Sequence, residues 1–203
     1  MKRLLAGGPV TFTGRYHHVE NLRLSPSLPA ELYPGILISG SSPAGLAAAQ
    51  AIEAIAVKYP EPLEQVGANA DAGGVDSGIR VGIIARETSE QAWSVAHERF
   101  PEDRKGQMTH ALAMKVSDSQ WHQQLSALAN QPLTDANPYW LGPFQNYKTF
   151  CPYLVGSYAR VARELAGYID LGFKTFILDI PPNREELGHI GITFNEAMKQ
   201  ASR

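Results

Sequence analysis

Short apolar runs, separated by stretches of helical character, constrain the fold of this chain more than any other feature. Four of them have the length and composition of buried strands, near residues 35–39, 55–58, 78–85 and 175–180. The first, GILIS, is apolar almost throughout, as expected of a strand covered on both faces in a parallel sheet. Strands that alternate with helices predict parallel βαβ units with right-handed crossovers.

Helical stretches lie between and after these runs. The first begins at Ser41-Ser42-Pro43, with a serine as N-cap and proline at the first helical position, and continues to about Ala54. The others are predicted at Leu63–Ala72, Glu87–Phe100 and Ser157–Leu171, with a last one after Pro181-Pro182. Four βα units of this kind make either half of an eight-stranded barrel or a small open sheet.

Two segments stand outside this alternation. Residues 1–34 predict a helix end closed by Gly7, a hairpin of Val10–Phe12 and Tyr16–Leu24, and a proline-rich loop. Residues 101–153 are polar and predict an irregular insertion with one helical piece near Asp118–Asn130. With 203 residues, the chain is expected to form a single domain over 1–203.

Composition narrows the functional class. The net charge of −2 gives no basic stripe of the kind that binds nucleic acid. A single cysteine, Cys151, permits no intrachain disulfide, which agrees with a reducing cytoplasm. No apolar run approaches the roughly 20 residues that span a bilayer, and no signal-peptide region is evident. Metal-binding and nucleotide-binding motifs such as HExxH, CxxC and the Walker loop are absent from the sequence, so no metal site is expected.

The best candidate binding site follows the first strand, at Ser39, Gly40, Ser41 and Ser42. Backbone N–H groups at a helix start point outward, and the helix dipole favours an anion there. Serine hydroxyls add donors, and Gly40 lets a ligand approach the backbone closely. These features predict a phosphate site, although a serine-rich N-cap with no ligand has the same pattern.

Arg80 is the second candidate, because it lies within the predicted strand 78–85. A guanidinium inside a barrel needs an anionic partner, whereas an arginine at a strand's exposed start pairs with a surface carboxylate. Both interpretations remain open. Lys58 and Tyr59 end the second strand, where active-site residues of parallel barrels lie, or where they form an ordinary rim. Weaker candidates are Arg86, Tyr147 and Lys148.

Several segments together resemble the luciferase-like flavin monooxygenases, nearest to the alkanesulfonate monooxygenase branch. They are GGPVTFTGRYHHVENLRL, ILISGSSPAG, KYPEP, GIRVGIIARETSEQAW, YLVGSYARVARELAGYIDLGFKTFILDI and REEL, and they occur in the family's order and spacing. The resemblance implies a partial TIM (β/α)₈ barrel, with an insertion before its last strand. It also implies reduced FMN and O₂ as co-substrates, a separate NAD(P)H-dependent flavin reductase as partner, and a small organic substrate. By the same resemblance, Ser41 and Ser42 bind the flavin phosphate.

The chain departs from the sulfonate-oxidising members at several positions. Arg80 matches their seventh-strand arginine, but Gly82 stands where they have a histidine, and Tyr59 stands where they have a tryptophan. No arginine occurs near Tyr147, where the family has a mobile-loop arginine, and Pro181 replaces a tyrosine. These departures indicate a substrate other than an alkanesulfonate, larger or less anionic.

Length is a further departure, because the family's members begin with four more βα units. We therefore expect a fragment, one half of a split enzyme, or a half barrel that pairs with another copy, since open strand edges associate. Two alternative functions stay open. One is a non-catalytic flavin-binding module like the superfamily's non-fluorescent flavoprotein, and the other is a deazaflavin (F420)-dependent oxidoreductase.

Overall fold

A computed structural model describes residues 2–39, 42–66, 77–129 and 137–201. The chain forms two compact units, Met1–Ile36 and Leu37–Arg203. The first unit contains helix α1 (Lys2–Leu5), strands β1 (Val10–Thr13) and β2 (His18–Leu22), and a short 3₁₀ helix, η1 (Ala30–Leu32). β1 and β2 pair antiparallel and Gly7 adopts a φ of +81°, which confirms the predicted hairpin and helix end.

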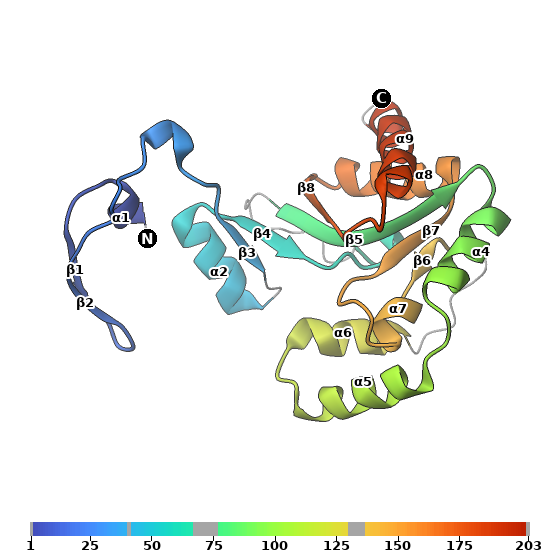
Figure 1. Cartoon of the computed structure of the whole chain (residues 1–203), viewed down its shortest axis with the longest axis horizontal. Coiled ribbons are helices and arrows are strands. Elements are labelled where there is room, and N and C mark those ends of the chain that lie inside the picture. Colours follow the sequence, from blue (N-terminus) through green and yellow to red (C-terminus); the bar gives the residue numbers. More distant parts are fainter. Residues whose placement is uncertain (1, 40–41, 67–76, 130–136, 202–203) are drawn as a thin grey trace. The chain divides into compact units, whose positions relative to one another are not determined.

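The second unit is built on parallel strands, which Figure 1 shows in colours that run from blue at β3 to red-orange at β8. The strands β3 (Leu37–Ser39), β4 (Ile55–Lys58), β5 (Ser77–Arg86) and β8 (Phe173–Leu178) are neighbours in that order, and every pair is parallel. This confirms the four strands predicted from the apolar runs.

Helices follow the strands as the alternation predicts. Their bounds are α2 (Pro43–Ile52), α3 (Leu63–Val66), α4 (Ser89–Arg99), α6 (Gln120–Ala129), α8 (Tyr158–Asp170) and α9 (Arg184–Gln200). Ser42 caps α2, and Thr88 caps α4 through a capping box with Gln91, so local sequence sets both helix starts. The predicted continuation of α3 to Ala72 lies outside the described residues.

The prediction for residues 101–153 was wrong in part, because this segment is more regular than its polarity indicated. It contains α5 (Arg104–Val116), capped by Asp103, as well as β6 (Tyr139–Trp140) and α7 (Gly142–Gln145). A strand, β7 (Tyr153–Ser157), then precedes α8. β7 forms because β5 extends beyond β4: β4 pairs with Ser77–Ile79, and β7 pairs with Gly82–Arg86.

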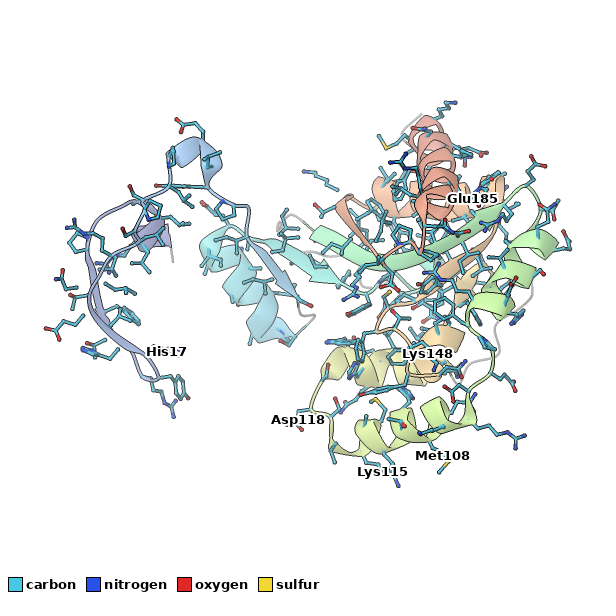
Figure 2. The ribbon with its side chains drawn as sticks, in the orientation of Figure 1. His17, Met108, Lys115, Asp118, Lys148 and Glu185 are labelled. Atoms are coloured by element: carbon cyan, nitrogen blue, oxygen red, sulfur yellow. The ribbon has the colours of Figure 1, made fainter. Side chains whose placement is uncertain are left out.

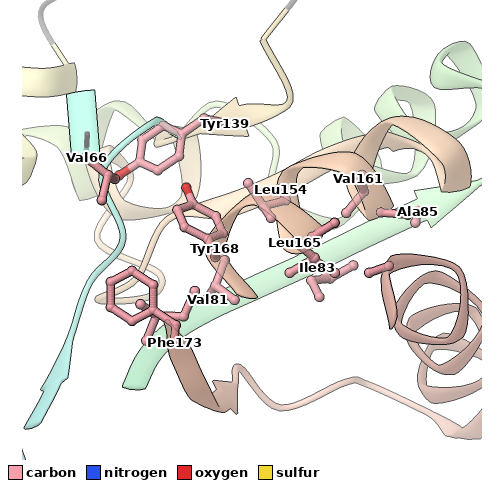
Figure 3. Packing of buried hydrophobic residues seen from close by; sticks show 14 of the residues in the cluster. Val66, Val81, Ile83, Ala85, Tyr139, Leu154, Val161, Leu165, Tyr168 and Phe173 are labelled. Carbon is pink, nitrogen blue, oxygen red and sulfur yellow. The ribbon is translucent and has the colours of Figure 1, made fainter. Parts of the chain in front are cut away.

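The two faces of β5 pack into different clusters. Ile79, Val81, Ile83 and Ala85 pack against residues of β7, α8 and α9 in the larger cluster, where Figure 3 shows Val81 and Ile83 among Leu154, Leu165 and Tyr168. On the opposite face, Ile84 packs with small residues of α4 and with Tyr153. Arg80 and Gly82 share the face of Ile84, because side chains alternate along a strand.

Candidate functional site

The register of the parallel strands brings residues distant in sequence to one place. Lys58 of β4 lies opposite Ile79 of β5, so Tyr59 comes level with Arg80. Val81 lies opposite Leu178 of β8, so Asp179 comes just beyond, and its amide donates to the Val81 carbonyl at 3.1 Å. Residues that follow the carboxyl ends of β4 and β8 therefore meet at a residue of β5.

Asp179 is the centre of a polar network on this face. One carboxylate oxygen contacts Nη2 of Arg80 at 3.4 Å. The other accepts hydrogen bonds from the Tyr153 hydroxyl at 2.6 Å and from the Thr149 hydroxyl at 3.0 Å. The carboxylate is thus held by three partners, and it fixes one side of the Arg80 guanidinium.

Arg80 retains donor capacity in this network. Its side chain is 38% exposed, and its Nε is buried without a hydrogen-bond partner in the described part of the chain. A guanidinium has five N–H donors, and the long contact with Asp179, together with interactions with the Tyr59 hydroxyl and the Cys151 thiol, leaves its Nε unsatisfied. The sequence left open whether Arg80 faces an anion inside a barrel or pairs with a surface carboxylate. In the structure Arg80 pairs with a carboxylate, but that carboxylate is Asp179, which is largely buried and directly follows β8.

Tyr59 lies between Arg80 and an aromatic residue of the insertion. Its ring stacks on Trp121 of α6, with centroids 4.3 Å apart and planes inclined by 29°. Burial raises the pKa of the Tyr59 phenol above its ordinary value, and the adjacent Arg80 guanidinium partly offsets that rise. The phenol therefore stays protonated at neutral pH. Trp121 lies 62 residues from Tyr59 in the sequence, so only the tertiary structure brings the two rings together.

Two buried tyrosines hold the loop that carries Tyr59. The Tyr139 hydroxyl donates to the Pro60 carbonyl at 2.8 Å, and the Tyr168 hydroxyl donates to the Glu61 carbonyl at 2.7 Å. Both tyrosine side chains are buried, and a buried hydroxyl without a partner is costly. The position of Tyr59 is therefore set by β6 and α8, not by its own strand alone.

Gly82 has no room for a side chain. A Cβ at this position would lie 2.3–2.5 Å from three ring atoms of Tyr153. The Tyr153 ring thus fills the volume next to Arg80 and Asp179 that a residue at position 82 would occupy. A larger residue at position 82 would therefore require the Tyr153 ring to move.

Cys151 and Tyr153 both belong to this network, through Thr149 and Asp179 respectively. Burial raises the pKa of the Cys151 thiol to about 11, so the thiolate is scarce at neutral pH. Burial, together with its hydrogen bond to Asp179, also raises the pKa of the Tyr153 phenol well above its ordinary value. Both groups serve as neutral members of the network.

The predicted phosphate site follows β3. Ser39 is the exposed last residue of β3, and the Ser42 hydroxyl accepts a hydrogen bond from the Gly45 amide at 3.1 Å. Gly40 and Ser41 lie outside the described residues. Lys58 is in register with Ile79 and lies over the Phe173 ring at 5.2 Å, so it occupies the sheet face opposite Arg80.

The weaker candidates lie apart from the network. Arg86 forms an ion pair with Glu186 of α9, and both side chains are largely buried. Lys148 binds Asp103, the N-cap of α5, at 2.6 Å. Tyr147 is 40% exposed and adopts a positive φ of 56°. The first two have structural partners that account for them.

A cavity of about 450 Å³ lies within the insertion, between α5, α6 and α7. It is lined by Gln107, His110, Met114, Ser126, Ala129 and Gln145. In the described part of the chain, His110 Nε2 and Ser126 Oγ are buried without a hydrogen-bond partner. Burial lowers the pKa of His110, so its ring is neutral at physiological pH.

The described ranges contain neither a metal site nor a membrane-spanning helix. Within them, no group of three or more His, Cys, Asp or Glu side chains is placed to hold a metal ion. Nor does any helix there have the length and apolar character needed to cross a membrane.

Comparison with known proteins identifies the family. The sequence model of the luciferase-like monooxygenase family matches residues 1–175. The chain belongs to the luciferase-like monooxygenase family. A curated relative, the 4-(gamma-L-glutamylamino)butanoyl-[BtrI acyl-carrier protein] monooxygenase BtrO of Niallia circulans, is 38% identical over 186 residues, which are 89% of this chain and 54% of the relative.

Solved structures of luciferase-like enzymes share the fold. DmoA from Hyphomicrobium sulfonivorans aligns with a TM-score of 0.65 at 17% identity, over 97% of this chain and 48% of that protein. The oxygenating constituent of 3,6-diketocamphane monooxygenase from Pseudomonas putida, solved in complex with FMN, aligns with a TM-score of 0.58 at 14% identity, over 98% and 60%. These matches confirm the α/β class and the partial (β/α)₈ barrel. The chain spans 48–60% of the length of the three relatives.

Proposed function

We propose that this chain is part of a flavin-dependent monooxygenase that uses reduced FMN and O₂ to oxidise an organic substrate. The observation that carries the proposal is the Arg80 guanidinium, partly exposed beside Tyr59 and with a buried Nε that no described group binds. It lies where residues beyond the carboxyl ends of parallel strands converge, the region of a barrel that holds active sites. We also propose a separate NAD(P)H-dependent reductase as the source of reduced flavin.

The junction between β3 and α2 suits the phosphate of FMN. The first turn of α2 contains no acidic residue, and Pro43 and Ala44 are exposed there. Amides of a first helical turn lack intrahelical partners, and the dipole favours an anion. The phosphate would be bound by Ser39, Gly40, Ser41 and Ser42. Lys58 would add positive charge, since it follows Val57, the β4 residue that pairs with Ser39. Bound FMN would supply the oxygen chemistry.

Arg80 and Tyr59 would act on the substrate side. Arg80 would stabilise negative charge that develops during oxygen transfer, because a preorganised cation acts strongly where water is excluded. Asp179 orients the guanidinium, and the carboxylate is itself held by Tyr153 and Thr149. Tyr59, stacked on Trp121, would form a wall that excludes water.

An acyl group attached to a carrier protein is the substrate class we propose. The support is the relative BtrO, whose name gives a carrier-bound acyl substrate and which is 38% identical to this chain. The absence of a side chain at Gly82, where sulfonate-oxidising relatives have a histidine, also argues against a sulfonate.

Flavin binding tests the proposal. Changing Ser41 and Ser42 together to Ala should weaken FMN binding by roughly 1–3 kcal/mol, because charge-assisted donors are lost. Riboflavin, which lacks the phosphate, is the matched control and should bind equally to both forms. Equal losses for the two ligands would mean that the serines only cap α2. Tighter binding of deazaflavin F420 than of FMN would favour the F420-dependent alternative.

A non-catalytic flavin-binding protein is the second candidate function. The observation in its favour is Gly82, since the Tyr153 ring occupies the space of a family side chain associated with catalysis. Oxygen consumption in the presence of a flavin reductase, NADH and a carrier-bound acyl substrate separates the two. Flavin binding without substrate-dependent oxygen uptake would support the non-catalytic function.

A further inference from the structure

Helix α5 of the insertion presents an exposed face with an unusual composition. Its apolar residues Met108, Leu112 and Val116 are 68%, 62% and 83% exposed. They are spaced by four residues, so they form a stripe along one side of the helix. Figure 2 shows Met108 pointing away from α6, toward solvent. Contiguous apolar residues at a protein surface indicate an interaction site, whereas single exposed apolar residues do not.

Basic side chains flank the apolar stripe. Arg104, Lys105 and Lys115 are exposed on the same helix. At about 100° per residue, these three and the stripe fall within an arc of about 120°. The opposite side of α5 is occupied, since Gln107, His110 and Met114 line the cavity shared with α6 and α7. The outer face of α5 is therefore both apolar and cationic.

No acidic residue neutralises this face from within its own helices. Neither α5, α6 nor α7 contains an Asp or Glu. Among the described residues, Asp103 is bound by Lys148, and Glu102 and Asp118 lie beyond the two ends of α5. Three exposed basic side chains on this face therefore outnumber the two exposed acids at the helix ends, and this arrangement favours a partner that carries acids around an apolar contact.

We infer that the outer face of α5 is the docking surface for the acidic carrier protein that delivers the acyl substrate. This inference rests on the proposed function and names its partner. A second copy of this chain fits the same face poorly, because a symmetric antiparallel pairing would set Arg104 and Lys105 against Lys115 of the other copy. An acidic helix with apolar residues at its centre complements both features, with methionine supplying an adaptable contact.

Binding of the BtrI acyl-carrier protein, in its form without the prosthetic group, is the direct test. Its dissociation constant is measured by fluorescence anisotropy at low and at moderate salt. Charge reversal by Arg104→Glu, Lys105→Glu and Lys115→Glu should weaken binding roughly tenfold or more and abolish most of its salt dependence. The pair Met108→Ser and Leu112→Ser should also weaken binding about tenfold, while leaving the salt dependence intact.

A matched control carries the same change in total charge elsewhere. Arg15→Glu, Arg23→Glu and Lys199→Glu alter exposed basic residues outside α5 and should leave binding within about twofold of the parent. Circular dichroism confirms that each variant is folded. No carrier binding by the parent, no loss on reversal of α5, or an equal loss in the control would each overturn the inference. The inference would also be overturned if sedimentation showed a dimer that Met108→Ser with Leu112→Ser converts to a monomer while carrier binding stays unchanged.

A substrate without its protein separates this inference from the proposed function. An acyl-pantetheine thioester bypasses docking, so the α5 variants should oxidise it as well as the parent does, with FMN and reductase supplied. If no thioester is oxidised but carrier binding still depends on α5, the proposed function fails and the docking surface stands. If thioesters are oxidised but the α5 variants bind the carrier as well as the parent does, the docking surface is wrong and the proposed function stands.

Discussion

Gly82→Ala should be among the most destabilising single-methyl changes in this protein. The added Cβ would lie 2.3, 2.4 and 2.5 Å from Cζ, Cε2 and Cε1 of Tyr153, about 1 Å inside ordinary contact. Tyr153 has little freedom to move. Its backbone pairs with Gly82 in the ladder, its hydroxyl binds Asp179 at 2.6 Å, and its ring packs on Phe100 with centroids 5.1 Å apart. Overpacking of this kind costs roughly 2–3 kcal/mol.

Urea denaturation, followed by tryptophan fluorescence, measures the effect as a lower midpoint at unchanged slope. Gly188→Ala is the matched control, because nothing lies within 4 Å of a Cβ at this position of α9. In a helix that control should stabilise by about 0.5–1 kcal/mol. A Gly82→Ala variant as stable as the parent would refute the steric argument.

A double-mutant cycle sharpens the test. Tyr153→Leu shortens the side chain and removes the ring atoms that would meet the new Cβ. The cost of Gly82→Ala should then fall, with a coupling energy of roughly 1–3 kcal/mol between the two changes. Additive costs would show that position 82 requires glycine for a reason other than the Tyr153 ring.

Three further predictions concern titratable groups. Burial raises the pKa of Glu164, so the stabilisation from its protonated form is full below the ordinary carboxyl pKa and is lost as pH rises through the raised pKa. The urea midpoint of Glu164→Gln should therefore increase relative to that of the parent between pH 4 and pH 8, and a constant difference would contradict this. Because burial raises the pKa of Cys151 to about 11, an aromatic disulfide reagent at pH 7.5 should label it only after unfolding, and rapid labelling of the folded chain would contradict its burial. Asp179→Asn should cost roughly 1–3 kcal/mol in urea unfolding, since Arg80 loses its carboxylate partner, and an unchanged midpoint would show that solvent replaces it.

Local sequence predicted the elements whose determinants are local. The hairpin, the starts of α2 and α4 and the four strands β3, β4, β5 and β8 follow from caps, turns and apolar runs within about ten residues. β7 was missed because its run is short and continues directly into α8, so the amphipathic pattern of the helix dominated. α5 was missed because its exposed face is apolar and basic together, which gives no clean helical periodicity.

The candidate site divides in the same way. Arg80, Tyr59 and Ser42 were identified from sequence, because a residue type at a strand end or helix start is visible there. Their partners were not: Asp179 is 99 positions from Arg80, and Trp121 belongs to the insertion. Nothing in the sequence around Gly82 indicated that the Tyr153 ring fills its side-chain space.

The sequence by itself determined the family, the alternation of strands and helices, and the residues able to bind an anion, since each depends on short-range pattern and residue chemistry. Only the tertiary structure decided which of those residues meet. Strand register places Arg80 level with Tyr59 and next to Asp179, and it directs Lys58 to the opposite face. Register is a property of backbone pairing between distant segments, and a shift by one residue would turn each side chain to the other side of the sheet.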